Sequence, residues 1–256
     1  MELGLEGRRA AVAASTSGLG LAAARALAAE GVRVAICGRD EERLAAAAAS
    51  FPAADGDRGR GGVVAVRADV GTGEGATAFV EQAVEALGGL DILVVNGGGP
   101  PAGTFESTPL EAYPGALAAN LLSVVGMCRA AVPAMRSQGW GRVVAITSFG
   151  VRQPIADLIL SNTARAGATG FLKTLALEVA ADGVTVNSVL PGYHATERLT
   201  SLYGDDLGGL AGSVPAGVIG DPVDFGAVVA FLCSERARYV TGTALAVDGG
   251  SVRGLL

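Results

Sequence analysis

Short apolar stretches alternate with longer amphipathic stretches along the whole chain, and this alternation limits the folds that the chain can adopt. Seven apolar stretches are predicted to be strands, at residues 10–12, 32–37, 63–67, 91–95, 141–147, 184–189 and 243–247. Strands without a polar face, separated by helices, are typical of a parallel sheet that helices cover on both sides. Because the 256 residues show no internal repeat or linker, we predict a single doubly wound, Rossmann-type α/β domain spanning residues 1–256.

Helices are predicted at residues 21–30, 41–49, 72–87, 112–137, 162–181 and 223–233, and a polar, glycine-rich loop at residues 55–62. Residues 72–87, for example, repeat apolar side chains at helical spacing and end at Gly88-Gly89. The stretch at residues 191–221 is rich in glycine and only weakly periodic. Because long irregular stretches in compact domains are usually functional, we expect a mobile lid at about residues 192–220.

A turn of small residues, AASTSGLG at positions 13–20, joins the first predicted strand to the first predicted helix. Such a turn leaves backbone N–H groups unpaired and directs the positive end of the helix dipole at one point, where a pyrophosphate can bind. Gly18 allows the backbone to approach a ligand, and Gly20 allows the helix to pack closely on the strand. A second strand follows directly, which supplies the βαβ context that the motif requires. In a glycine-rich chain the motif alone leaves an ordinary strand–helix turn as an equal alternative.

The loop after the second predicted strand reads Gly38-Arg39. In dinucleotide sites this position carries an acidic residue for the ribose hydroxyls or a cation for a 2′-phosphate. Gly38 offers no carboxylate, and the guanidinium of Arg39 suits a phosphate, so the sequence favours NADP(H) over NAD(H). The alternative is an exposed surface arginine that Asp40 and Glu41 neutralise.

Composition argues against several other functions. A formal net charge of −6 leaves no basic surface for a nucleic-acid partner. Cys37, Cys128 and Cys233 are far apart and accompany a single histidine, which indicates buried reduced thiols and no metal site. No N-terminal signal is seen, and no run of about 20 apolar residues that a membrane helix needs. We therefore expect a soluble, cytoplasmic protein without a membrane partner.

Further motifs follow in a fixed order along the chain. They are Asp69-Val70 after the third predicted strand, Asn96-Gly97-Gly98 after the fourth, Asn120 within a long helix, Pro191-Gly192 with Thr196 after the sixth, and residues 241–250. Together with residues 13–20, where Ala13 and Ala14 replace a Thr and a Gly, they resemble the short-chain dehydrogenase/reductase family over essentially the whole chain. Within that family, residues 141–144 and the C-terminal motif are most similar to 3-oxoacyl-acyl-carrier-protein reductases.

The resemblance implies a nicotinamide coenzyme. By correspondence with the family's motifs, the residues that hold it are Ala14, Thr16, Ser17, Gly18, Leu19, Gly20, Arg39, Asp69, Val70, Asn96, Gly97, Gly98, Arg165, Pro191, Gly192 and Thr196. The resemblance also implies a small carbonyl compound or an acyl thioester as substrate, and a homotetramer or homodimer assembled through residues 112–137 and 162–181. Considered without the family, Asp69 can equally form a strand-end turn, and Asn120 can equally satisfy a backbone group in its helix.

The catalytic positions depart from the family's pattern. Ser148 stands where the family has a serine, at the end of the fifth strand. The family's spacing then leads to Ser161 and Arg165, where its members have a tyrosine and, four residues later, a lysine. No tyrosine occurs between Tyr113 and Tyr193. In the family the tyrosine protonates the carbonyl oxygen, while the lysine lowers the pKa of that tyrosine and binds ribose hydroxyls.

Three hypotheses follow for the chemistry, because an aliphatic hydroxyl is a far weaker acid than a phenol with a pKa of about 10. In the first, Tyr193 or His194 supplies the proton, although, taken singly, Tyr193 is better explained by packing under the lid and His194 by an exposed loop position. In the second, Ser148, Ser161 and Asn120 only polarise the carbonyl, and catalysis is slow. In the third, the chain binds NADP(H) without turnover and acts as a sensor or oligomer partner. A serine hydrolase is disfavoured because no G-x-S-x-G surrounds Ser148.

Overall fold

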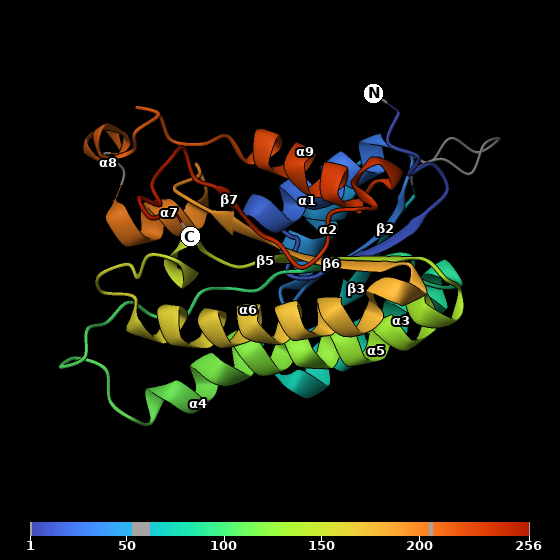
Figure 1. The fold of residues 1–256 in the computed structure, drawn as a ribbon, viewed down its shortest axis with the longest axis horizontal. Helices are drawn as coiled ribbons and strands as arrows, with labels where there is room; N and C mark the ends of the chain where they lie inside the picture. The colour runs from blue at the N-terminus through green and yellow to red at the C-terminus, as the bar shows by residue number, and fades with distance from the viewer. Residues whose placement is uncertain (1, 53–61, 205–206, 256) are drawn as a thin grey trace.

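The computed structural model describes residues 2–52, 62–204 and 207–255, and within them the centre of the molecule is a seven-stranded parallel sheet (Figure 1). The strands are β1 (Arg9–Val12), β2 (Arg33–Gly38), β3 (Val63–Arg67), β4 (Ile92–Val95), β5 (Gly141–Ile146), β6 (Val184–Pro191) and β7 (Ala244–Val247). Their order is β3-β2-β1-β4-β5-β6-β7, and every neighbouring pair is parallel. The predicted doubly wound α/β fold is confirmed. The loop predicted at residues 55–62 lies, except for Gly62, outside the described residues.

Helices cover both faces of the sheet and give the molecule three layers (Figure 1). One face carries α1 (Gly18–Ala29), α2 (Glu41–Ala49) and α9 (Pro222–Cys233). The other carries α3 (Gly73–Leu87), α5 (Ser123–Ser137) and α6 (Ile159–Val179), with α4 (Ala112–Leu117) extending α5 at its N-terminal end. Ala10 and Val12 of β1 belong to the core under α1 and α9, whereas Ala11 belongs to the core under α3 and α5. Both faces of each strand are therefore buried, which explains the uninterrupted apolar stretches.

The winding of the chain reverses at β1. This strand pairs with β2 on one side and with β4 on the other, and Val12 aligns with both Ile36 and Val94. The connections that follow β1 and β4 therefore leave the sheet on opposite sides. A crevice forms beyond the carboxyl ends of these two strands, which is where open α/β sheets bind their ligands.

Local capping explains where several helices begin and end. Side chains accept hydrogen bonds from first-turn N–H groups of α2, α3, α7 (Glu197–Tyr203) and α9; the capping residues are Asp40, Thr72, Thr196 and Asp221. Gly88 ends α3 in the left-handed conformation, at φ 74°. These signals involve residues only two or three positions apart, so they are visible in the sequence. The predicted helix over residues 41–49 accordingly matches α2 at both ends.

The segment predicted to be an irregular lid contains two short helices, so that part of the prediction is wrong. They are α7 and α8 (Gly208–Ser213), which lie together at one end of the molecule (Figure 1). Thr196 caps α7 and Gly204 ends it, at φ 79°. With seven and six residues, these helices are shorter than the window in which helical periodicity can be recognised. The mobility of the lid stays a prediction.

The helical stretch Ala112–Ser137 corrects a second expectation. Its 26 residues and mean hydropathy of 1.5 would allow it, by length and composition alone, to cross a membrane, although no such run was expected from the sequence. In the structure it consists of α4, a π-helical turn η1 (Ala118–Leu122) and α5. Val124, Met127 and Ala131 of α5 pack into the core, and 44% of the most apolar window is buried in protein. The stretch is apolar because α5 is a core helix of the domain.

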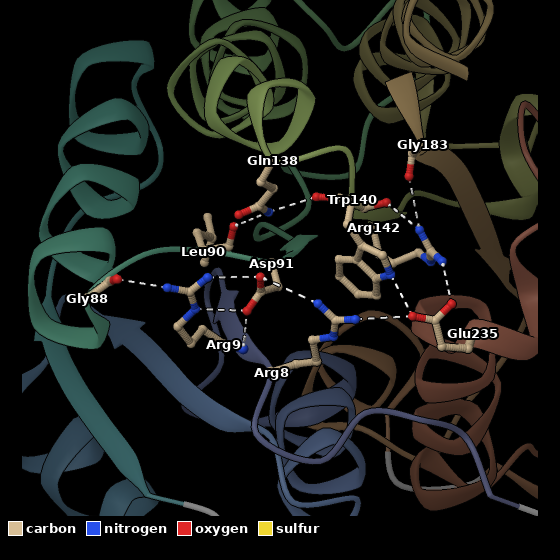
Figure 2. Close-up of polar contacts among 11 residues, drawn as sticks. Arg8, Arg9, Gly88, Leu90, Asp91, Gln138, Trp140, Arg142, Gly183 and Glu235 are labelled. Atoms are coloured by element: carbon tan, nitrogen blue, oxygen red, sulfur yellow. Dashed lines mark hydrogen bonds and ion pairs between the residues drawn. The ribbon is translucent and has the colours of Figure 1, made fainter. Parts of the chain in front are cut away.

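A chain of ion pairs and hydrogen bonds crosses the other end of the sheet, at the amino ends of β1, β4 and β5 (Figure 2). Asp91, directly before β4, accepts hydrogen bonds from Nε and Nη2 of Arg9 at 2.8 and 3.0 Å. Arg8 pairs with Glu235 at 3.1 Å and stacks on the Trp140 ring, its Cζ 3.8 Å from the ring centroid. Burial by itself would raise the pKa of Asp91, but the hydrogen bonds and charge of Arg9 outweigh it and hold that pKa below its ordinary value.

Arg142 continues this network inside the sheet. Its side chain is only 2% exposed, and its Nη1 donates to the carbonyl oxygens of Gly141 and Gly183 at 2.8 and 3.3 Å. Its Cζ lies 4.3 Å from the centroid of the Trp140 ring, and its Nη2 lies 3.7 Å from Glu235. Burial is the largest influence on the pKa of Arg142 and lowers it. The network thus joins three strands at the end of the sheet farthest from the crevice.

We expect Asp91→Asn to lower the free energy of unfolding by about 2–3 kcal/mol at neutral pH, because Arg9 loses its buried anionic partner. The pKa of Asp91 is depressed in the folded protein, so its contribution is complete above the pKa of an unfolded aspartate and is lost as the pH falls through the folded value. The difference from wild type should therefore shrink once the pH falls below the ordinary aspartate pKa of about 4, and vanish when Asp91 is protonated in the folded protein as well. Urea unfolding at neutral and acidic pH measures it, and a pH-independent difference would contradict the ion-pair account.

Candidate functional site

A cleft of about 1010 Å³ opens at the carboxyl ends of β1, β2, β3, β4, β5 and β6, with α7 along its border. Every residue predicted from the sequence to form the site lines this cleft, with the exception of Gly20. The contributing segments are the turn before α1, the loops after five strands, and the beginning of α6. Residues that are far apart in the sequence are thus brought together at the switch point of the sheet.

The turn between β1 and α1 presents free N–H groups to the cleft. Ser17, the residue before α1, makes no side-chain hydrogen bond to the first helical turn, and that turn contains no acidic residue. In this respect α1 differs from α2, α3, α7 and α9, which side chains cap. Ala14 and Gly18 adopt left-handed conformations, at φ 45° and 56°, and so shape the turn. Uncapped N–H groups at the positive end of a helix dipole are suited to a pyrophosphate.

Gly20 supports this turn from behind the cleft. A Cβ atom at Gly20 would lie 2.6 Å from the Ala14 carbonyl oxygen and 2.5 Å from Nδ2 of Asn96. That Asn96 nitrogen donates to the same Ala14 oxygen at 3.0 Å, which joins the end of β4 to the turn. Gly20 is therefore required for the close approach of α1 to β1, and it does not itself face the cleft.

Ser15 and Cys37 hold the turn against β2. The hydroxyl of Ser15 donates to the Val12 carbonyl at 2.7 Å and accepts from the Cys37 N–H at 3.1 Å. Burial raises the pKa of the Cys37 thiol to about 12, so it stays protonated and unreactive. All three cysteines are buried and free, as predicted. Within the described part of the chain, no three His, Cys, Asp or Glu side chains are placed to hold a metal ion.

The Thr16 side chain occupies the place at the end of β2 where other sites carry an acidic side chain. A Cβ atom at Gly38 would lie 2.4 Å from Cγ2 of Thr16, so a larger residue at position 38 would require Thr16 to move. The Arg39 side chain is 78% exposed, and its Nη1 lies 3.9 Å from Oδ2 of Asp69. Asp40 and Glu41 were considered as its neutralising partners, but Asp40 caps α2 and Glu41 pairs with another arginine. The carboxylate that faces Arg39 is instead that of Asp69.

The polar groups expected to carry the chemistry lie deeper in the cleft. Ser148 precedes a short 3₁₀ turn, η2 (Phe149–Val151), and its Oγ accepts from the Gly150 N–H at 3.0 Å. Ser161 is buried in the first turns of α6, and its hydroxyl has no hydrogen-bond partner among the described residues. Asn120 lies in the π-helical turn η1, and its Nδ2 donates to the Ala116 carbonyl at 3.3 Å. Such single π turns frequently occur at functional sites.

Arg165 fills the floor of the cleft and is held there by backbone oxygens. Its Nη1 donates to the carbonyls of Ile146 and Thr147, each at 3.1 Å, and its Nη2 donates to Gly97 at 3.4 Å. Burial lowers the pKa of Arg165 to about 10, and the like charge of Arg198 acts in the same direction. The guanidinium therefore remains charged at neutral pH and connects the ends of β4 and β5.

Three aromatic rings stack along the outer part of the cleft. The ring centroids of Phe149 and Tyr193 are 5.6 Å apart, as are those of Tyr193 and Tyr203, and both pairs are edge-to-face. Burial, followed by the charge and hydrogen bond of the Tyr193 hydroxyl, raises the pKa of Tyr203 to about 12, and Arg198 opposes this shift. Tyr203 and Arg198, both on α7, are lining residues missed by the sequence reasoning. The only local signal for them is their position after Thr196.

His194 does not occupy the exposed position considered for it. The residue is 6% exposed, and its ring packs edge-to-face on Phe225 with centroids 5.0 Å apart. Its Nδ1 lies 3.3 Å from the Gly192 carbonyl oxygen. Burial lowers the pKa of His194, so the imidazole is neutral at neutral pH. The packing of α9 against this loop, which the sequence does not reveal, accounts for the difference.

Fold and cleft together define a class of protein: a Rossmann-type α/β domain with its cleft at the switch point, where dinucleotides bind in this class. The family described as enoyl-(acyl carrier protein) reductase matches residues 13–252. The 3-oxoacyl-[acyl-carrier-protein] reductase FabG of Haemophilus influenzae is 35% identical over 246 residues, which are 96% of this chain and 98% of that protein. The chain belongs to the short-chain dehydrogenase/reductase family, as the resemblance predicts.

Two further relatives extend over almost the whole chain. Dehydrogenase/reductase SDR family member 4 of Sus scrofa is 34% identical over 251 residues, 96% of this chain and 88% of that protein. The structure of L-sorbose reductase from Gluconobacter frateurii, complexed with NADPH and L-sorbose, is similar with a TM-score of 0.90 and 34% identity, and the match covers 100% of both chains.

Because an alanine at position 20 meets backbone atoms that cannot move aside, we expect Gly20→Ala to lower the free energy of unfolding by about 1–3 kcal/mol. Gly170→Ala is the matched control, since Gly170 lies in α6 with open space around its Cα. That variant should be unchanged or more stable by about 0.5–1 kcal/mol. Urea unfolding of both variants measures the effect, and a Gly20→Ala protein as stable as the control would contradict the close-packing role.

Proposed function

We propose that the protein is an NADP(H)-dependent short-chain oxidoreductase that interconverts a carbonyl and an alcohol, similar to 3-oxoacyl reductases but with an atypical active site. The observation that carries this proposal is the composition of the cleft: an uncapped helix N-terminus, an exposed arginine at the end of β2, and hydroxyl and phenol groups share one space. The relatives named as 3-oxoacyl reductase and as L-sorbose reductase with NADPH support the reaction class and the coenzyme.

The residues present fit a nicotinamide coenzyme. The N–H groups at the start of α1 would hold the diphosphate, and the exposed guanidinium of Arg39, next to Gly38, would bind the 2′-phosphate of NADP(H). Asp69-Val70 would border the adenine, and Asn96 to Gly98, Pro191-Gly192 and Thr196 would border the remainder of the coenzyme, as the family resemblance implies. Bound NADPH supplies the hydride that reduces the carbonyl carbon, and it leaves as NADP⁺.

The proton for the carbonyl oxygen is assigned to Tyr193. By the spacing of the family's motifs, Ser161 stands where its members have a tyrosine, and its aliphatic hydroxyl is too weak an acid for this step. The Tyr193 phenol lines the cleft, and its ring packs edge-to-face on that of Tyr203, which is 40% exposed at the rim. In this scheme, a proton from solvent reaches the substrate oxygen by way of Tyr203 and Tyr193. Ser148 would orient that oxygen by hydrogen bonding.

Arg165 has a positioning role in this scheme. In place of the family's lysine, its guanidinium holds the ends of β4 and β5 through three carbonyl oxygens. Two of its five N–H donors at most remain for ribose hydroxyls. Because it keeps its charge at neutral pH, it favours an anionic oxygen in the floor of the cleft.

The alternative function is a protein that binds NADP(H) with little or no turnover and acts as a sensor or oligomer partner. The observation that favours it is Ser161, a buried hydroxyl at the position from which the family's members donate the proton. We further propose a cytoplasmic location and a homotetramer or homodimer assembled through the stretch at residues 112–137 and through α6. The proposed substrate is a small carbonyl compound or an acyl thioester.

We expect Tyr193→Phe to lower kcat for NADPH-dependent carbonyl reduction by about 10²–10⁴-fold, because the general acid is removed. The Kd for NADPH, measured by titration of NADPH fluorescence, should stay within about twofold. Tyr239→Phe is the control, since Tyr239 is fully exposed before β7 and therefore lies at the opposite end of the sheet. An unchanged kcat in Tyr193→Phe would eliminate Tyr193 as the donor. Tight NADPH binding by wild type without any oxidation would favour the alternative function.

The coenzyme preference has a separate test at Arg39. Arg39→Gln should weaken NADPH binding by about 10-fold and leave NADH binding nearly unchanged, because only NADPH carries the phosphate that the guanidinium contacts. Arg238→Gln, an exposed arginine before β7, is the control for loss of one surface charge. Fluorescence titration with both coenzymes measures the ratio. An equal loss for the two coenzymes, or a wild-type preference for NADH, would contradict the assignment.

A further inference from the structure

Arg198 reaches across the cleft from α7 to the loop after β4. Its Nη2 donates to the Pro100 carbonyl at 2.7 Å. Gly99 makes this approach possible, since a Cβ atom there would lie 3.0 Å from the same nitrogen and 3.3 Å from Nε. The guanidinium thus lies along the glycine-rich loop, and one N–H bond of its five is used by the protein.

The charges that line the cleft are unevenly paired. Arg39 faces Asp69, and the Glu197 carboxylate is taken by Arg43 of α2 at 2.5 Å. Among the residues that the structure describes, neither Arg165 nor Arg198 forms an ion pair with a carboxylate, and both contact carbonyl oxygens instead. The remaining lining carboxylate, Glu111, lies exposed at the rim. Among the described lining residues, Arg165 and Arg198 are therefore cations that no carboxylate contacts, although the charge of Asp157, outside the lining, also acts on Tyr203 and the chain as a whole has a net charge of −6.

Arg198 is also close to the groups assigned to proton transfer. Its helix, α7, also carries Tyr203, whose ring packs edge-to-face on that of Tyr193 with centroids 5.6 Å apart, and Arg198, Tyr203 and Tyr193 all line the cleft. An anion bound to Arg198 would therefore lie beside the carbonyl group that Tyr193 protonates. Thr196, two residues earlier, is the residue that contacts the diphosphate turn, with its Cγ2 3.6 Å from a Cβ position on Gly18. The guanidinium of Arg198, by contrast, contacts the loop after β4.

We propose that Arg198 binds the carboxylate of the substrate, so that this cleft takes free 3-oxo acids in preference to their uncharged esters or thioesters. The proposal rests on the proposed function and names its substrate class. A guanidinium with free N–H groups matches a carboxylate in planar, two-point geometry, and a partly enclosed cleft strengthens that contact. In a 3-oxo acid the carbonyl carbon is two bonds from the carboxylate carbon, so an acid held by Arg198 keeps its carbonyl group in the cleft that Tyr193 also lines.

The test compares acetoacetate with ethyl acetoacetate, which have the same carbonyl and differ in charge. NADPH oxidation gives kcat/KM for each compound in wild type, Arg198→Gln, Arg198→Lys and the control Arg238→Gln. We expect the ratio of acid to ester to fall by about 10- to 100-fold in Arg198→Gln, to fall less in Arg198→Lys, and to be unaffected in the control. An equal ratio in wild type and Arg198→Gln would overturn the proposal.

Two further measurements separate the possible failures. The Kd of Arg198→Gln for NADPH shows whether Arg198 binds the coenzyme diphosphate. If the affinity for NADPH falls by as large a factor as kcat/KM for acetoacetate, Arg198 contacts the coenzyme and the proposal is overturned. If wild type oxidises no NADPH with either compound, the proposed function fails. Calorimetry of 3-hydroxybutyrate binding to the protein with NADP⁺ then tests, independently of catalysis, whether Arg198 binds a carboxylate. If 3-hydroxybutyrate binds to wild type and not to Arg198→Gln, the result supports the anion site. If it binds to neither protein, or equally to both, the result overturns the proposal.

Discussion

The close contact between α1 and the turn after β1 is the constraint on which the cleft depends. Gly20 has no side chain, so α1 begins directly at the end of β1 and its N-terminus points into the crevice beside β4. Ser15 secures the turn to β2, and Asn96 secures it to β4. The uncapped N–H groups of α1 consequently have a fixed position relative to the loops that supply the remaining groups of the cleft.

Arginines serve different purposes at the two ends of the sheet. At the amino ends of the strands, Arg8 and Arg9 face the carboxylates of Glu235 and Asp91, and the charges neutralise one another in a partly buried network. At the carboxyl ends, Arg165 and Arg198 have carbonyl oxygens as partners within the described residues. A carbonyl satisfies an N–H group but leaves the positive charge uncompensated, so the first network stabilises the fold and the second favours an anion.

The proposed chemistry depends on which side chains of the cleft can donate a proton to the substrate. Serine hydroxyls at positions 148 and 161 can orient an oxygen, whereas a phenol can also release a proton at a useful rate. The two tyrosines of this cleft come from the loop after β6 and from α7, and their rings meet in an edge-to-face contact. The acid has thus moved from the sheet side of the cleft to its lid side in the scheme proposed here.

The sequence by itself determined the class of fold and most of the segments that line the cleft. Alternation of apolar residues, glycine at a turn and a cap such as Thr72 act over a few residues, so the strands, several helix boundaries and the tight turn before α1 are predicted correctly. The short helix α7, the burial of His194 and the pairing of Arg39 with Asp69 were decided only by the tertiary structure. These features depend on contacts across the crevice between loops that follow different strands. Such contacts cannot be predicted from the spacing of residues along the chain. Arg198 is the clearest case, because its partner and its free charge exist only once α7 lies beside the loop after β4.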